Sequence, residues 1–441
     1  MLFALRRHPL RYLLFLTVRW RRRAIFLLGG ITVGGAAVAF AKLADLAQHE
    51  FQRMLAIAPY APLAITPLSF AALVYVTNRV FPNSQGSGIP QAIAARRLID
   101  HGARGRLVSA RIAVGKVLLT LLGLLCGASV GREGPSVQVG ASIMFLVGRL
   151  SPSRQPGLIL AGAAAGVAAA FNTPLAGIVF GIEEMSRSFE LRASGLILGA
   201  VIAAGLTSLT LVGDYSYFGT TAAMLHSGVD WLAVPVCGVV GGLLGGVFSR
   251  ILIEVARGLP GAVGRWIKAN PVAFAAICGA LTAITGIASG STTYGTGYEQ
   301  VSGLLDGSRA MPESFGILKM AATVFSSISG LPGGIFSPSL AVGGGLGADI
   351  AAFFPGTPLG ALILLGMVSY FTGVVQAPIT AFVIVTEMTN NHELLVPLML
   401  ASVIAYSASR LVCPIGVYHA LAEGFLRQAS PPAAARREVR S

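Results

Sequence analysis

The stretch GREGP, residues 131–135, directly follows the apolar run VLLTLLGLLCGASV, residues 117–130. It places Arg132 and Glu133 side by side, between two glycines and ahead of a proline. A charge at the centre of a bilayer costs roughly 2.5–3.5 kcal/mol on insertion scales. If the chain spans a membrane, this pair must therefore lie at the membrane edge or have a function.

The composition indicates that the chain does span a membrane. Of its 441 residues, 54% are hydrophobic and only 11% are charged, whereas soluble domains carry about 25% charged residues. Long apolar runs recur, such as IFLLGGITVGGAAVAFA (25–41) and PLGALILLGMVSYFTGVV (358–375). A helix needs about 20 apolar residues to cross a bilayer. We therefore predict an all-α polytopic membrane protein, because a soluble fold would expose too much apolar surface.

The net charge of +14 has a simple interpretation in terms of topology. Segment 1–24 carries seven arginines and no acid, and the tail 427–441 carries four arginines and one glutamate. The positive-inside rule predicts that both ends are cytoplasmic, with the basic segment 95–111 on the same side. Contact with anionic lipid headgroups explains the charge. We expect no nucleic-acid partner, and the short tails without a nucleotide-sensing domain favour a bacterial inner membrane.

The residues that usually form metal or hydrolytic sites are dispersed. The four cysteines and six histidines form no CxxC, HxxxH or HExxH pattern. An enzyme embedded in the membrane would need a nucleophile–base set or a metal cluster. We therefore expect no metal, no cofactor and no enzymatic activity.

Glycine and proline interrupt the apolar runs throughout, with 55 and 23 copies. Such interruptions predict short, tilted or broken helices that end inside the membrane, where protein or a water-filled cavity must satisfy their ends.

Two motifs recur along the chain. GREGPSVQVG (131–140) resembles GGIFSPSLAVG (333–343), and NTPLAGIVFGIEEM (172–185) resembles QAPITAFVIVTEM (376–388). Both pairs are separated by nearly the same number of residues, which predicts duplicated membrane halves at 25–215 and 216–426, joined near the polar stretch 212–230. Duplicated halves with discontinuous helices are typical of transporters that bind their substrate near the midplane.

Three Gly/Pro-rich segments, GSGIP (86–90), GREGP (131–135) and GGIFSP (333–338), each precede a helix-like sequence. Proline is favoured in the first helical turn, so each segment is predicted to begin a helix. Helix N-termini have unpaired N–H groups and a partial positive charge. Several converging N-termini would bind an anion without holding it too tightly for transport. The candidate residues are Gly86, Ser87, Gly88, Ile89, Pro90, Gly131, Arg132, Glu133, Gly134, Pro135, Gly333, Gly334, Ile335, Phe336, Ser337 and Pro338.

These three segments, followed by the tyrosine of PIGVYHALAE (414–423), resemble the CLC family of chloride channels and chloride/proton antiporters. The likeness extends over roughly residues 20–425, includes FNTPLAGIVFGIEEM (171–185), and matches prokaryotic members without CBS domains. It implies a CLC-like fold of two inverted repeats, a homodimer with one pathway per subunit, and chloride and protons as the transported ions.

The resemblance also implies roles for individual residues. Chloride would be contacted by the hydroxyls of Ser87 and Tyr418 and by the backbone amides of Ile335 and Phe336. On its own, Ser87 would more simply be a helix N-cap. Glu133 would be the gate, competing with the anion for its site and transferring protons on the outer side.

Glu184, the second acid of IEEM, would transfer protons on the inner side. Its presence favours antiport over the alternative, a passive chloride channel on the same scaffold, although both acids could merely end a helix at the inner surface. Arg132 is expected to attract anions at the outer mouth, and Glu387 to be structural. Gln91 and Ile93 stand where acids are common, so Lys116 must be neutral, paired elsewhere or solvated.

Overall fold

The computed structural model describes residues 9–186, 191–213, 216–226, 228–309 and 311–429, without the side chains of 9–23, 153, 191–194 and 196. Over these ranges the regular secondary structure is helical, and the loops between helices contain two isolated backbone bridges. The prediction of an all-α polytopic fold is confirmed. The α-helices are α2 (Pro9–Ile57), α3 (Pro62–Arg79), α4 (Ile89–Arg97), α5 (His101–Gly105), α6 (Ala110–Leu125), α7 (Glu133–Val147), α8 (Gln155–Phe171), α9 (Pro174–Phe180), α10 (Leu191–Val212), α11 (Ala233–Arg257), α12 (Gly261–Ala269), α13 (Pro271–Ala288), α14 (Tyr298–Leu305), α15 (Phe315–Ile328), α16 (Phe336–Ala351), α17 (Leu359–Val375), α18 (Pro378–Thr389), α19 (Leu395–Val412) and α20 (Val417–Ala429).

Helix lengths vary widely. Among the described residues, five helical segments are long and apolar enough to cross a bilayer, and five more apolar helices have only 10–17 residues. These short helices fit the prediction of broken segments. The predicted cytoplasmic segment 1–24 overlaps α2, which begins at Pro9, while residues 1–8 and 430–441 lie outside the described residues.

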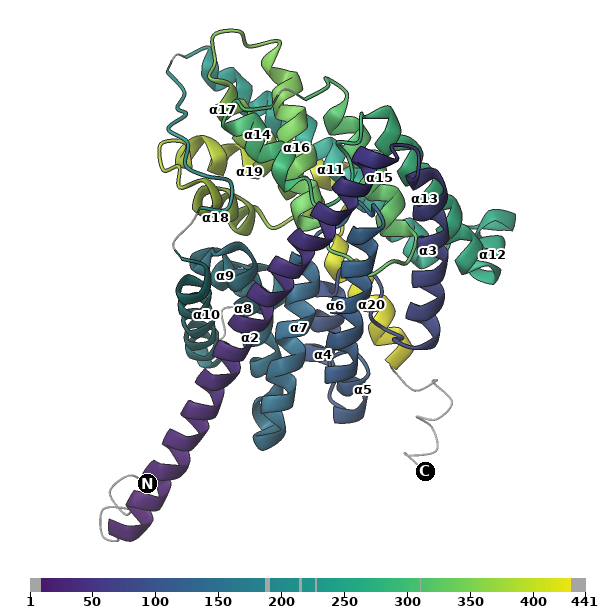
Figure 1. Cartoon of the computed structure of the whole chain (residues 1–441). Helices are drawn as coiled ribbons and strands as arrows, with labels where there is room; N and C mark the ends of the chain where they lie inside the picture. The colour runs from purple at the N-terminus through teal and green to yellow at the C-terminus, as the bar shows by residue number, and fades with distance from the viewer. Residues whose placement is uncertain (1–8, 187–190, 214–215, 227, 310, 430–441) are drawn as a thin grey trace.

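The helices of the two sequence halves pack in matching ways (Figure 1). α7 packs on α8 as α16 packs on α17. Likewise, α2 contacts α8 and α10 as α11 contacts α17 and α19. The last helix, α20, returns to the first half and packs against α4, so the C-terminal part of the chain completes the region around the GSGIP loop.

Glycines permit the closest crossings in each half. A Cβ on Gly140 of α7 would collide with the carbonyl of Gly162 of α8, and the reverse also holds. Gly343 of α16 and Gly366 of α17 have the same reciprocal relation. Small residues that allow backbones to touch are typical of helix packing in membranes.

Contacts between the halves are reciprocal as well. Glu183 accepts hydrogen bonds from the amides of Ile379 and Thr380 at the start of α18. Glu387 accepts the equivalent bonds from Leu175 and Ala176 at the start of α9. Such exchange of equivalent partners is what a local two-fold axis produces. The boundary near 216 stays a prediction, because residues 214–215 lie outside the described part.

Candidate functional site

Backbone hydrogen bonds join the three Gly/Pro-rich segments. The amide of Gly86 donates to Leu331, 3.1 Å away, and the amide of Gly333 donates to Gly86 at 3.0 Å. Gly131 and Gly334 exchange both of their amide–carbonyl bonds at 2.7 Å. The segments GSGIP, GREGP and GGIFSP therefore meet at one place, although they are far apart in sequence.

Each segment begins a helix, as predicted. α4 starts at Ile89, α7 at Glu133 and α16 at Phe336. Gly88 precedes α4 with a φ of 99°, which is a backbone conformation that favours glycine. The unpaired amides of these three helix ends are thereby brought close together.

A cavity of about 380 Å³ opens beside these helix ends and is lined by Ser87, Ile335 and Tyr418 together. The hydroxyls of Ser87 and Tyr418 are buried, and among the described residues neither has a hydrogen-bond partner except the other hydroxyl. Phe336 lies next to Tyr418, with 5.9 Å between ring centroids. Buried hydroxyls normally have partners, and these two lie together on one cavity wall, which makes them candidate donors to an anion. The structure thus brings together the four residues predicted to contact an anion. Most of the remaining wall is apolar, including Leu252, Phe274, Leu421 and Phe425.

Glu133 is the first residue of α7 and is completely buried. Its Oε1 accepts a hydrogen bond of 2.6 Å from the hydroxyl of Ser337, in the first turn of α16. Its Oε2 is buried without a partner among the described residues. The carboxylate is therefore held where two helix N-termini meet, which is a favourable location for a negative charge.

Arg132 is 6% exposed, and its guanidinium donates to the carbonyl of Ala41 and the carboxylate of Asp45, both on α2. The side chain of Asp45 is itself 59% exposed. These contacts tie α2 to the start of α7, and the role of Arg132 in attracting anions stays a prediction.

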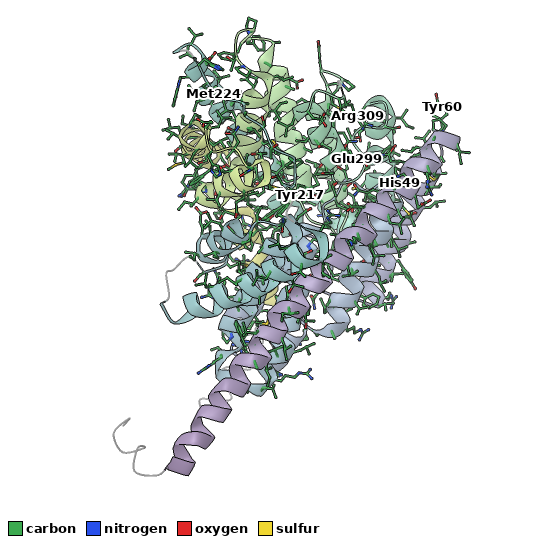
Figure 2. The ribbon with its side chains drawn as sticks, turned by 60° about the vertical axis from the view of Figure 1, so that its left-hand side comes forward. His49, Tyr60, Tyr217, Met224, Glu299 and Arg309 are labelled. Carbon is green, nitrogen blue, oxygen red and sulfur yellow. The ribbon has the colours of Figure 1, made fainter. Side chains whose placement is uncertain are left out.

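An aromatic cluster surrounds Phe336, and it includes a residue that sequence reasoning missed. Phe171, Phe180 and Phe371 all have ring centroids within 6.2 Å of the Phe336 ring. Tyr217 packs edge-on against Phe171 and is 2% exposed. Figure 2 shows Tyr217 near the centre of the molecule. Its segment has the composition of a polar connection between the halves, so the sequence does not indicate that Tyr217 packs in this cluster.

The two acids of IEEM lie in a single π-helical turn, Gly181–Ser186, that follows α9. Glu183 is bonded to the start of α18, whereas Glu184 is 3% exposed and its Oε1 lies 3.1 Å from Nδ1 of His419. The alternative, that both acids merely end a helix at the surface, does not fit a buried Glu184. The sequence analysis does not predict a role for His419 either. Its only local signal is its place directly after Tyr418.

Lys116 is completely buried, and its ammonium donates to the carbonyls of Gln85 and Gly86, 3.3 and 2.8 Å away. Gln91 also bonds Gln85, through its side-chain amide. Of the alternatives for Lys116, the structure shows pairing elsewhere: its partners are backbone carbonyls, and these bonds hold the loop that carries Ser87.

Comparison with known proteins agrees with this geometry. The sequence model of the voltage gated chloride channel family matches residues 69–410. The chain belongs to the voltage-gated chloride channel family. A relative named H(+)/Cl(-) exchange transporter ClcA, from Yersinia pestis bv. Antiqua (strain Angola), is 33% identical over 84% of this chain and 80% of its own length.

Solved structures show that this member of the family has the family's fold. A slow cyanobacterial Cl-/H+ antiporter has a TM-score of 0.78 at 24% identity, covering 92% of this chain and 98% of its own. A CLC-type fluoride/proton antiporter also has a TM-score of 0.78, at 23% identity, covering 91% and 97%.

Proposed function

We propose that this chain exchanges chloride for protons across a membrane. The observation that carries the proposal is the cavity on which two neighbouring buried hydroxyls, from Ser87 and Tyr418, adjoin converging helix ends. Two buried carboxylates, Glu133 and Glu184, supply the proton-carrying groups that a passive pore does not need. The name of the ClcA relative, an H(+)/Cl(-) exchange transporter, supports the same conclusion.

In this proposal chloride is held by dipoles. The hydroxyls of Ser87 and Tyr418 and the amides of Ile335 and Phe336 replace part of its hydration shell. Arg132 pairs with the carboxylate of Asp45, and the ammonium of Lys116 donates to backbone carbonyls. The direct ligands of the proposed anion are therefore dipoles, which hold it weakly enough to leave.

Glu133 is the proposed gate and the outer proton-transfer group. Its carboxylate lies at the N-termini of α7 and α16, so as an anion it competes with chloride for the same helix ends. When it is protonated, this attraction weakens and the side chain can give way to chloride. Glu184 is the proposed inner proton-transfer group, because carboxylates buried at membrane depth commonly form proton relays.

The deciding experiment measures coupling. Purified protein in liposomes is exposed to opposed chloride and pH gradients, and the reversal potential is recorded. We expect a reversal potential displaced from the chloride equilibrium value by the pH gradient. A passive chloride channel would remain at the chloride value. Glu184→Val should abolish proton movement and spare chloride flux.

The wider assignment follows from the same proposal. We place the protein in a bacterial inner membrane with both termini cytoplasmic, as a homodimer in the lipid bilayer. Its two membrane halves are 25–215 and 216–426, flanked by the basic segments 1–24 and 427–441. It needs no cofactor, binds no nucleic acid and is a transporter rather than an enzyme. Within the described residues, no group of three or more His, Cys, Asp or Glu side chains could hold a metal ion.

A further inference from the structure

His419 lies on α20, directly after Tyr418, and is buried against Glu184. Its Nδ1 is 3.1 Å from Oε1 of Glu184, and the two side chains are 6% and 4% exposed. Its second ring nitrogen, Nε2, is buried and has no hydrogen-bond partner among the described residues. The imidazole therefore has one polar contact, and that contact is the carboxylate proposed to carry protons on the inner side.

Several charged groups on the elements packed around this pair have other partners. Arg96 of α4 donates to the carbonyls of Met185 and Ser186, which fixes the backbone of the π-helical turn. Arg250 and Glu254 of α11 pair with each other at 2.8 Å. Glu183, next to Glu184, is bonded to α18, and on α20 itself Arg427 lies near Glu423. The other titratable residues of the helices packed on α20 are Arg97, Cys237, Arg257 and Tyr370.

We propose that His419 and Glu184 form one proton-binding unit, in which the imidazole shares the proton that Glu184 takes up from the inner side. The inference rests on the proposed antiport and identifies a second residue in it. The proton moves between Oε1 and Nδ1, so that an O–H bond breaks as an N–H bond forms and no other reactant is needed. A buried carboxylate that lost this proton without a partner would carry an unpaired charge, at a high desolvation cost. Histidine suits the role because one nitrogen of its neutral ring accepts while the other donates, and both donate when the ring is protonated.

The position of His419 also links the proton to the anion. Tyr418, which lines the chloride cavity, and His419, which contacts Glu184, are consecutive residues of one helix. Any movement of α20 that adjusts one of these contacts must affect the other. His419 is thus a positioning residue for Glu184 as well as a proton carrier.

The test compares His419→Gln with the wild type in liposomes. Chloride and proton fluxes are measured together across pH 5–8. Glutamine can still donate a hydrogen bond to Glu184 but cannot carry a proton. We expect chloride flux to persist, proton flux to fall by at least about tenfold, and the pH dependence of the remaining proton flux to change. His392→Gln, at an exposed histidine, is the matched control and should leave both fluxes unchanged.

Glu184→Gln distinguishes a failure of the proposed role of Glu184 from a failure of the proposed role of His419. If it leaves proton flux intact, the proposed role of Glu184 is wrong. If it abolishes proton flux while His419→Gln keeps the wild-type ratio and pH profile, only the role of His419 is overturned. Should His419→Gln fail to fold, ring-labelled histidine NMR of wild type and Glu184→Gln replaces it. A histidine whose ring resonances report a different protonation state in wild type and in Glu184→Gln supports the shared proton, and identical histidine spectra contradict it.

Discussion

Replacing Tyr418 with phenylalanine removes one hydroxyl and leaves the packing of the ring in place. The side chain is completely buried, and its ring lies 5.9 Å from that of Phe336, centroid to centroid. Among the described residues its hydroxyl has no hydrogen-bond partner except the neighbouring hydroxyl of Ser87. The substitution therefore removes at most this one contact between two cavity-lining groups, and its main effect should fall on anion binding rather than on folding.

The size of the effect follows from the loss of one donor. A hydrogen bond contributes a net of about 0.5–1.5 kcal/mol when water competes for both partners. Chloride should therefore bind about 2- to 13-fold more weakly to Tyr418→Phe. Isothermal titration of purified protein with chloride measures this change directly, and thermal unfolding checks that stability is retained.

Tyr370 provides a matched control for this measurement. It is also completely buried with an unpartnered hydroxyl among the described residues, but it does not line the cavity. Tyr370→Phe should leave the chloride dissociation constant unchanged. An unchanged constant in Tyr418→Phe, or an equal loss in both variants, would remove Tyr418 from the anion site.

Three further predictions test the gate, the link between the halves and the packing. Glu133→Ala removes the carboxylate that competes with chloride, so chloride should pass without coupled protons, and a reversal potential that still follows the pH gradient would contradict the gate. Glu183→Gln turns an amide N–H toward two backbone donors and the Thr380 hydroxyl, and it should destabilise the protein by roughly 1–3 kcal/mol. Glu387→Gln affects two backbone donors and should cost no more; a larger loss in Glu387→Gln by thermal unfolding in detergent would contradict this account. Gly140→Ala forces a methyl group against the backbone carbonyl of Gly162 and should lower the free energy of unfolding by about 1–3 kcal/mol. The same unfolding measurement checks this, and an unchanged stability would mean that α7 can move away from α8.

The sequence predicted the beginnings of the helices well because those signals are local. Glycine and proline mark where α4, α7 and α16 start, and the motif letters contain both residues. The same signals indicated that the apolar runs are short and broken. Ser87, Glu133, Phe336 and Tyr418 also belong to recognisable motifs, so the structure only had to show that they lie together.

The partners of the charged residues could not be predicted, because they lie far away in sequence. Ser337 is 204 residues from Glu133, Asp45 is 87 residues from Arg132, and His419 is 235 residues from Glu184. No local pattern connects such pairs. The π-helical turn that contains both Glu183 and Glu184 has no sequence signature either. Arg96, which donates a hydrogen bond to a carbonyl of this turn, lies 89 residues away from Met185.

Two buried lysines at corresponding positions of the two halves, Lys116 and Lys319, make the same kind of contact. Lys319 is completely buried and donates to the carbonyls of Thr293 and Gly295, just as Lys116 donates to Gln85 and Gly86. Each lysine thus holds a glycine-rich loop that precedes a short helix, α14 in one case and α4 in the other.

The two loops differ in what their hydroxyl residue contacts, although a cavity adjoins each of them. The loop before α14 reads GTGYEQ (295–300) where the loop before α4 reads GSGIPQ (86–91). Thr296 donates both its amide and its hydroxyl to Oε1 of Gln48, at 2.8 and 3.1 Å. Among the described residues the hydroxyl of Ser87 has no carbonyl or amide acceptor of this kind, and its neighbour is the hydroxyl of Tyr418. In the second half the protein therefore supplies the acceptor for this hydroxyl, whereas in the first half the proposed acceptor is the transported anion.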